Sequence, residues 1–184
     1  MPRFVFYTAS TLNGYLADAD HSLEWLFAVE GGEQPDMAGF LADIGVLVLG
    51  SHTYEWLEDH EHLIENPAKW KSWYAERPTF VFTSRRLPAP DGVDVRFVAG
   101  SVADALPAIR SAAGDLDVWL VGGGDLVGQF DDAGALDEIQ ISLAPVTLVS
   151  GKPLLPRRIE SDRLRLSEVT RNGQFVDLKY TVLR

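Results

Sequence analysis

The chain contains no cysteine. This absence excludes a disulfide framework, a zinc site built on thiolates and a cysteine nucleophile, and it fits an intracellular, cytoplasmic location. The motifs H-E-x-x-H and G-x-S-x-G are missing as well, so a zinc protease and an α/β-hydrolase triad are not expected. His60-Glu61-His62 places two imidazoles at alternate positions of a polar segment, which is typical of a solvated loop. We therefore expect no metal site.

Positive charge is scarce, since 16 basic residues stand against 27 acidic ones and the formal net charge is −11. Such a balance argues against binding to a nucleic-acid backbone or an anionic membrane surface. It does not exclude a small phosphorylated ligand, because a few backbone amides and one or two arginines are enough locally.

Long hydrophobic runs are also lacking. The apolar run at residues 1–8 is too short for a membrane span or for the apolar region of a signal peptide. A length of 184 residues with 46% hydrophobic content fits one domain over residues 1–184. We expect a soluble protein without linkers or repeats.

The order of apolar segments predicts a mostly parallel α/β sheet. Continuous or alternating apolar runs indicate strands at residues 4–9, 44–49, 79–83, 93–98, 117–121 and 138–143. Capping residues, proline positions and helical spacing indicate helices beginning at Ser22, Asp36, Ser51, Pro67, Ser101 and Gly124. The last two strands, 164–170 and 175–183, are joined around Asn172-Gly173, a hairpin signal. The chain should therefore finish in an antiparallel hairpin, and the alternation of Val176, Leu178, Tyr180 and Val182 with polar residues predicts one buried and one solvated face for its last strand.

The most informative segment is the strand at 117–121, which runs directly into Gly122-Gly123-Gly124 and a helix start. Glycines let the backbone approach a bound group, and the helix start offers free N–H donors and a positive dipole end to a phosphate. A tight turn that merely needs glycine is the other interpretation. The dinucleotide fingerprint G-x-G-x-x-G fails, because its third position falls on Val127, and the P-loop pattern is absent. His52, just after another strand and glycine, could donate to a phosphate or be an exposed helix-start residue.

Read in order, several segments are similar to one family. They are Ser10-Thr11-Leu12-Asn13-Gly14-Tyr15-Leu16-Ala17, Leu23-Glu24-Trp25-Leu26, Leu49-Gly50-Ser51-His52-Thr53-Tyr54-Glu55, Phe82-Thr83-Ser84-Arg85, Val121-Gly122-Gly123-Gly124, Leu136-Asp137-Glu138, Ala144-Pro145-Val146 and Gly151-Lys152-Pro153-Leu154. The chain resembles the dihydrofolate reductase-like group, closest to the reductase domain of the riboflavin-biosynthesis deaminase-reductase and its stand-alone relatives. The resemblance implies a three-layer α/β/α fold around a mixed sheet of about eight strands with a C-terminal hairpin, and a homodimer.

The resemblance also implies an NADPH site. Its cofactor-binding residues would be Ala9, Gly14, Gly50, Ser51, His52, Thr53, Thr83, Ser84, Arg85, Gly122, Gly123, Gly124, Asp125, Leu126 and Val127. Ser51 stands where the family often has arginine or lysine, so a preference for NADPH over NADH would rest on His52, Arg85 or Arg86.

On the substrate side the resemblance implies contacts from Asn13, Trp25 and Tyr54, although Trp25 could equally pack in the core. Ser22 takes the position of the carboxylate that holds the pterin in dihydrofolate reductases, which argues against that activity. Ser22, Glu24 and Asp20 are the candidate catalytic residues. We expect an NADPH-dependent reductase of a small heterocyclic or carbonyl substrate, similar to 5-amino-6-(5-phosphoribosylamino)uracil reductase. The alternatives are a nucleotide-sensing module without turnover and dihydrofolate reductase itself.

Overall fold

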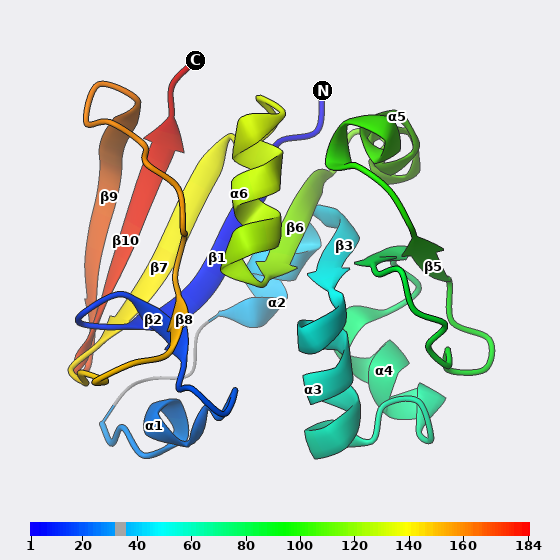
Figure 1. Cartoon of the computed structure of the whole chain (residues 1–184), viewed down its shortest axis with the longest axis horizontal. Coiled ribbons are helices and arrows are strands. Elements are labelled where there is room, and N and C mark those ends of the chain that lie inside the picture. The colour runs from blue at the N-terminus through cyan, green and yellow to red at the C-terminus, as the bar shows by residue number, and fades with distance from the viewer. Residues whose placement is uncertain (32–35) are drawn as a thin grey trace.

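A computed structural model describes residues 1–31 and 36–184 and places the strands in one large mixed sheet. Its order is β5-β4-β3-β6-β1-β7-β10-β9 (Figure 1). The first six strands of this order are parallel, whereas β10 runs antiparallel to β7 and to β9. The strands are β1 (Phe4–Thr11), β3 (Ile44–Gly50), β4 (Thr79–Phe82), β5 (Val95–Val98), β6 (Asp117–Gly122), β7 (Glu138–Ala144), β9 (Leu164–Asn172) and β10 (Phe175–Val182). The predicted mixed sheet with an antiparallel C-terminal hairpin is confirmed.

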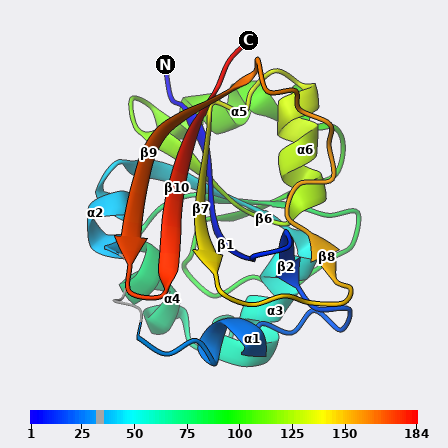
Figure 2. The same ribbon diagram turned by 90° about the vertical axis from the view of Figure 1, so that its left-hand side faces the viewer.

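Helices cover both faces of this sheet (Figures 1 and 2). They are α1 (Glu24–Phe27), α2 (Met37–Ala42), α3 (Ser51–Glu61), α4 (Pro67–Tyr74), α5 (Val102–Ala113) and α6 (Gly124–Asp132). One hydrophobic core lies between the sheet and α5 and α6 and includes Phe130 and Ile109. The other lies between the sheet and α2, α3 and α4 and includes Tyr54 and Trp70. These two cores give the predicted three-layer α/β/α arrangement.

Three of the helices begin with a capping side chain at the predicted residue or next to it. Asp36, Asn66 and Ser101 accept hydrogen bonds from the backbone N–H groups of Gly39, Lys69 and Asp104. The prediction for the first helix is wrong by one residue, because the N-cap is Leu23 and its side chain makes no capping bond. Ser22 still accepts a hydrogen bond from Glu24 N, at 3.1 Å.

Two short strands form a separate antiparallel pair that the sequence does not predict. β2 (Tyr15–Ala17) pairs with β8 (Lys152–Pro153). Strands of three and two residues are too short to show an alternating pattern. This pair brings the segment after β7 back to the loop before α1, at the end of the sheet where the parallel strands finish.

The C-terminal hairpin differs from the prediction in its turn and in its burial. Asn172 pairs with Phe175, so the loop consists of Gly173 and Gln174, with Gly173 at φ 58°. The buried face predicted for the last strand is confirmed in part, because Val182 is buried and Leu178 and Tyr180 are partly buried, whereas Val176 is exposed. On the edge strand β9, Leu166 and Val169 are exposed as well. In the part of the chain that the structure describes, no helix reaches this far across the sheet (Figure 1). The homodimer stays a prediction.

No helix in residues 1–31 and 36–184 is long and apolar enough to cross a membrane.

Candidate nucleotide-binding cleft

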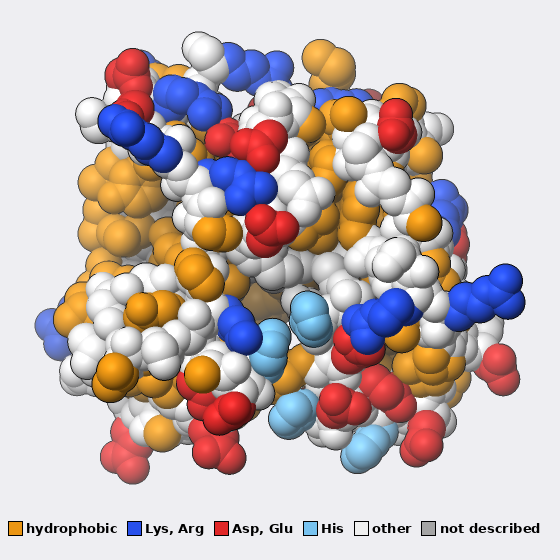
Figure 3. Space-filling view, in the orientation of Figure 1, with side chains coloured by type: hydrophobic (Ala, Val, Ile, Leu, Met, Phe, Trp, Pro, Cys, Tyr) orange, Lys and Arg blue, Asp and Glu red, His pale blue; other side chains and the backbone are white. Residues whose placement is uncertain are grey.

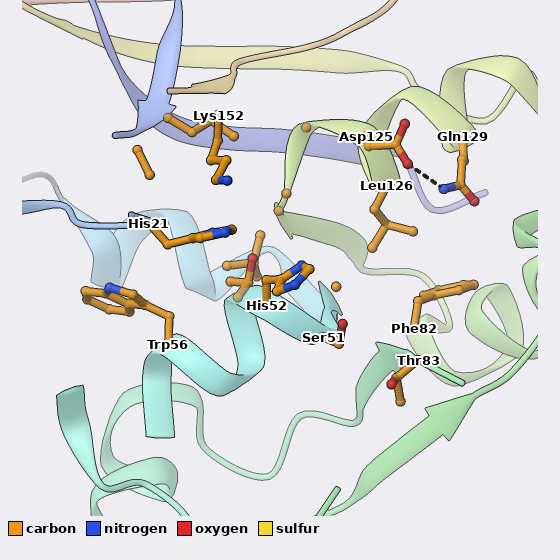
Figure 4. Close-up of a pocket in the computed structure, with 18 of the residues that line it drawn as sticks. His21, Ser51, His52, Trp56, Phe82, Thr83, Asp125, Leu126, Gln129 and Lys152 are labelled. Carbon is orange, nitrogen blue, oxygen red and sulfur yellow. Dashed lines mark hydrogen bonds between the residues drawn. The ribbon is translucent and has the colours of Figure 1, made fainter. Parts of the chain in front are cut away.

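A cleft opens where two neighbouring strands send their helices to opposite faces of the sheet. β3 and β6 are adjacent and parallel, yet α3 packs in the core on one face and α6 in the core on the other. In open α/β sheets such a divergence leaves a crevice at the carboxyl ends of the strands. A cavity of about 630 Å³ lies there, lined from β3, β4 and β6, from the starts of α3 and α6, and from β8 (Figure 4).

Two of the three consecutive glycines are required by local geometry. Gly122 has φ +144°, which side chains rarely adopt. A Cβ on Gly124 would lie 2.4 Å from the carbonyl oxygen of Leu154 and 2.6 Å from that of Pro153. A Cβ on Gly123 would meet nothing within 4 Å. The turn therefore needs glycine for its own conformation, and it also leaves open space beside Gly123.

Two helix N-termini point their backbone donors at the cavity. Gly50 caps α3 and Gly123 caps α6, and in neither case does a side chain accept from the first turn. The first N–H groups of a helix have no partner within it, and they carry the positive end of the helix dipole. Both starts line the cavity, through Ser51 to Thr53 and through Gly124 to Leu126. This arrangement suits an anionic ligand.

Asp125 is the acidic residue of the cavity lining. Its carboxylate accepts hydrogen bonds from Gln129 Nε2 at 3.0 Å and from Arg157 Nη1 at 3.1 Å. These two bonds lower the pKa of Asp125. Arg157, from the segment after β8, also pairs with Asp132 at 2.9 Å, so the Asp125 side chain is held by Gln129 on its own helix and by an arginine from outside it.

The end of the cavity near β4 has apolar walls and neutral hydroxyls. Phe82, Val98 and Leu126 supply the apolar surface, and Thr83 and Ser84 follow directly after β4. This combination fits a flat ring with a polar sugar attached.

The opposite end carries three basic side chains. His21, His52 and Lys152 come from the loop after β2, the first turn of α3 and β8, and Figure 4 shows them converging on the cavity. The His21 and His52 rings stack with centroids 5.1 Å apart. Partial burial, Lys152 and His52 lower the pKa of His21, against smaller opposing effects of Asp18 and Asp20.

The loop that presents His21 is held by one carboxylate. Asp18 Oδ1 accepts from the backbone N–H groups of Asp20, at 2.9 Å, and Ser22, at 2.8 Å. His21 lies between these two donors with φ 64°, a left-handed conformation that is uncommon for a residue with a side chain. Residues in such conformations cluster at binding sites.

Trp56 gives the cavity an aromatic wall, and its indole N–H has no hydrogen-bond partner among the described residues. Its ring stacks on His60 at 4.4 Å, and it lines the cavity. Its Nε1 is buried and makes no hydrogen bond within the described part of the chain. Buried donors are normally satisfied, and this one, like the Nε1 atoms of Trp25 and Trp70, has no partner among the described residues.

The structure brings most of the predicted cofactor-binding residues to this cavity. Gly50, Ser51, His52, Thr53, Thr83, Ser84, Gly122, Gly123, Gly124, Asp125 and Leu126 line it. Ala9, Gly14, Arg85 and Val127 are not in the lining. Val127 is fully buried in the core beneath α6, and Gly14 lies in the turn between β1 and β2.

The predicted substrate contacts lie elsewhere. Tyr54 is buried and donates to the carbonyl oxygen of Pro88 at 2.7 Å. Burial raises the pKa of its phenol. Asn13 bonds both backbone groups of Leu148. Trp25 lines a separate hollow of about 290 Å³ with Pro145 and other residues.

The candidate catalytic residues do not line the cavity either. Asp20 and Glu24 are exposed, and the Ser22 hydroxyl accepts from Glu24 N. The structure instead places His21, between two of these candidates, in the lining. Sequence reasoning missed His21, Lys152 and Trp56. The order of Asp20, His21 and Ser22 in the sequence does not indicate which of the three side chains faces the cavity. That depends on the turn in which Asp18 accepts hydrogen bonds from the backbone N–H groups of Asp20 and Ser22.

Within residues 1–31 and 36–184, no group of three or more His, Asp or Glu side chains is arranged to hold a metal ion.

The sequence matches the model of the RibD C-terminal domain over residues 2–176. The chain belongs to this family. The resemblance stated from the sequence motifs is thereby confirmed. A relative in Bacillus subtilis (strain 168), the uncharacterized protein YwjB, is 29% identical over 181 residues, 97% of each chain.

Two solved structures show the same fold. A Shewanella sp. PV-4 protein that carries a provisional riboflavin-biosynthesis name covers 100% of both chains with a TM-score of 0.71 and 24% identity. The diaminohydroxyphosphoribosylaminopyrimidine deaminase/5-amino-6-(5-phosphoribosylamino)uracil reductase of Thermotoga maritima has a TM-score of 0.66 and 16% identity. That match covers 98% of this chain and 56% of the Thermotoga protein. The chain therefore has the RibD C-terminal reductase-like fold.

Proposed function

We propose that this protein is an NADPH-dependent reductase that transfers hydride to a small heterocyclic, pyrimidine-like or pterin-like, or carbonyl substrate. The reaction would be similar to that of 5-amino-6-(5-phosphoribosylamino)uracil reductase, the activity named for the Thermotoga relative. The observation that carries the proposal is the cavity at the β3–β6 divergence, onto which two helix N-termini without side-chain caps open.

The lining fits a dinucleotide along its length. The first turns of α3 and α6 would hold the pyrophosphate through backbone N–H groups. Phe82, Val98 and Leu126 would pack against the adenine, with Thr83 and Ser84 beside its ribose. The remaining end, with Leu16, Leu23 and His21, would take the nicotinamide and the substrate.

When bound, NADPH supplies the hydride, and the protein supplies orientation and a site from which water is excluded. A proton must also reach the substrate. The basic groups in the lining are the imidazoles of His21 and His52 and the ammonium group of Lys152. Asp125 is held by Arg157 and Gln129 at the α6 side. An imidazole, the Lys152 ammonium group or water is therefore the proton donor that this cavity offers.

A nucleotide-sensing module without turnover is the second candidate. It is favoured by one observation, that Asp20, Glu24 and Ser22 lie outside the cavity lining, so that Asp125 is the one carboxylate that the described residues contribute to it. Dihydrofolate reductase is disfavoured for the same reason, because none of the described residues places a carboxylate at the end that would hold a pterin.

Single-turnover mixing tests the proposal. The protein is loaded with NADPH and mixed with the aminopyrimidine ribose phosphate of riboflavin synthesis or with dihydrofolate, while the absorbance of reduced nicotinamide is followed. A reductase oxidises the cofactor with one of them. A sensing module binds NADPH and oxidises none, and loss of the signal with dihydrofolate that methotrexate blocks identifies dihydrofolate reductase.

A matched pair of variants ties the result to the cavity. Ser51→Glu places a negative charge in the lining, whereas Ser72→Glu places the same charge on the exposed surface of α4. Ser51→Glu should weaken NADPH binding at least tenfold, about 1.4 kcal/mol, because the carboxylate faces the phosphates. Ser72→Glu should leave it unchanged. Equal effects of the two would contradict this cavity as the binding site.

A further inference from the structure

Arg85 is held in a bidentate ion pair by Glu55. Arg85 Nη1 donates to Glu55 Oε1 at 2.8 Å, and Arg85 Nη2 donates to Glu55 Oε2 at 2.7 Å. Two parallel bonds fix the guanidinium plane as well as its position. The Arg85 side chain is 50% exposed and the Glu55 side chain is 33% exposed. Glu55 projects from α3 and Arg85 from the segment after β4, so the pair links the two elements that flank one end of the cleft.

This pair stands immediately outside the cavity. Thr83 and Ser84 line the cavity, and the next residue, Arg85, does not. Ser51 lines it as well, and Glu55 follows one helical turn later on the same face of α3. The backbone N–H of Arg85 donates to Thr83 Oγ1 at 3.0 Å, which fixes the start of the segment. Glu55 thus holds the guanidinium against the flank of α3.

The lining at this end is consequently neutral. Ser51, Thr83 and Ser84 present hydroxyls, and Gly100 presents backbone. Besides Arg85, the nearby cation is Arg86, whose side chain makes no hydrogen bond or ion pair with the described residues. If an adenosine ribose bound here, a phosphate on it would lie near Arg85, but Arg85 is already paired with the Glu55 carboxylate.

We propose that Glu55 sets the selectivity of this cleft between NADPH and NADH, by competing with the ribose 2′-phosphate for Arg85. This proposal rests on the proposed function, since it assigns the adenosine end of the dinucleotide to the β4 side of the cavity.

Glu55 acts against the phosphate in two ways. First, Arg85 must break one or both of its hydrogen bonds to Glu55 in order to reach the phosphate. Second, the Glu55 carboxylate repels the negatively charged phosphate. An unphosphorylated ribose meets neither obstacle. Partly exposed ion pairs contribute modestly, so the expected discrimination is about fivefold rather than several orders of magnitude.

Binding titrations of the Glu55→Gln variant test this proposal without a substrate. The dissociation constants of NADPH and NADH are measured by tryptophan quenching for wild type and Glu55→Gln. Glutamine keeps the size of the side chain and removes its charge. We expect NADPH to bind about fivefold more tightly to the variant and NADH to bind as it does to wild type.

Two control variants separate the ion pair from net charge. Asp59→Asn removes the same charge one further turn along α3, where Asp59 is exposed, and it should change the NADPH to NADH ratio less than twofold. Arg85→Ala should weaken NADPH more than NADH, and more than Arg86→Ala does, because Arg85 is the cation that reaches the phosphate.

Three outcomes would overturn the proposal. If Glu55→Gln leaves the NADPH to NADH ratio unchanged, Glu55 does not set selectivity. If it weakens NADPH, Glu55 instead orients Arg85 toward the phosphate. If wild type binds neither dinucleotide, the proposed function fails and this inference fails with it, a result distinct from the first two.

Discussion

His21 and His52 stack their imidazole rings at the mouth of the cleft, with centroids 5.1 Å apart and planes 28° from parallel. The two residues come from different elements, and Lys152 approaches from a third (Figure 4). In the space-filling view, histidine side chains lie beside the central hollow, and both acidic and basic side chains appear elsewhere on this face (Figure 3). His21, His52 and Lys152 thus bring three basic side chains together at this opening of a protein whose net charge is −11.

We expect dinucleotide binding to tighten as the pH falls. In the free protein, partial burial, Lys152 and His52 lower the pKa of His21 and so favour its neutral form. A pyrophosphate bound at the start of α3, beside the His52 ring that stacks on His21, favours the His21 imidazolium and raises its pKa, so binding takes up a proton. The affinity for NADH, whose dihydronicotinamide is uncharged and whose pyrophosphate does not titrate in this range, should therefore rise between about pH 8 and about pH 6. Calorimetry in buffers of different ionisation enthalpy measures the proton uptake.

Replacing the histidine should remove this dependence. His21→Gln is expected to flatten the pH profile and abolish most of the proton uptake. His62→Gln is the control, because His62 is exposed at the C-terminus of α3 and does not line the cavity. Proton uptake that survives in His21→Gln would show that another group is responsible.

Gly124→Ala should destabilise the fold. The new methyl group would lie 2.4 Å and 2.6 Å from two backbone carbonyl oxygens, which cannot move aside as a flexible side chain can. Overpacking of this kind destabilises by about 2–3 kcal/mol. In Gly128→Ala of the same helix, the three atoms nearest the new methyl group belong to the Arg157 side chain, so the change in folding free energy should stay within about 1 kcal/mol. Urea denaturation compares them, and equal losses would refute this explanation.

Arg163→Ala should cost about 2 kcal/mol of folding free energy, because it leaves the carboxylate of Asp131 without its partner. Arg163 bonds both Asp131 oxygens, at 3.2 Å and 2.7 Å, and the Asp131 side chain is only 7% exposed. Arg158→Ala breaks the exposed pair with Glu160 and should cost less than about 0.5 kcal/mol. Thermal unfolding measures both, and a loss for Arg158→Ala as large as that for Arg163→Ala would contradict the argument from burial.

The sequence predicted those parts of the fold that depend on local signals. Asp36, Pro67 and Ser101 mark helix starts by hydrogen bonding or ring geometry within one turn. The hairpin turn lies one residue later in the chain than the sequence predicted, because the cross-strand pairing of Asn172 with Phe175 sets the register. Pro107 lies inside α5, yet the helix runs from Val102 to Ala113.

The site was predictable where it follows the ends of parallel strands. Gly50, Thr83 and Gly122 come together because β3, β4 and β6 finish at one edge of the sheet. Tyr54 illustrates a signal that was present and unused, since Tyr54 and Leu57 repeat at helical spacing and both face the core. Lys152 was not predictable, because it reaches the cavity only through the short pairing of β8 with β2.

Tryptophan fluorescence on adding NADPH tests the central claim most directly. Trp56 lines the cavity, whereas Trp73 is exposed on α4 away from it. We predict saturable quenching and a higher melting temperature in wild type, with most of the quench lost in Trp56→Phe and retained in Trp73→Phe, while both variants keep the thermal protection. No quench and no thermal protection at NADPH concentrations up to the millimolar range would contradict a nucleotide site in this cleft.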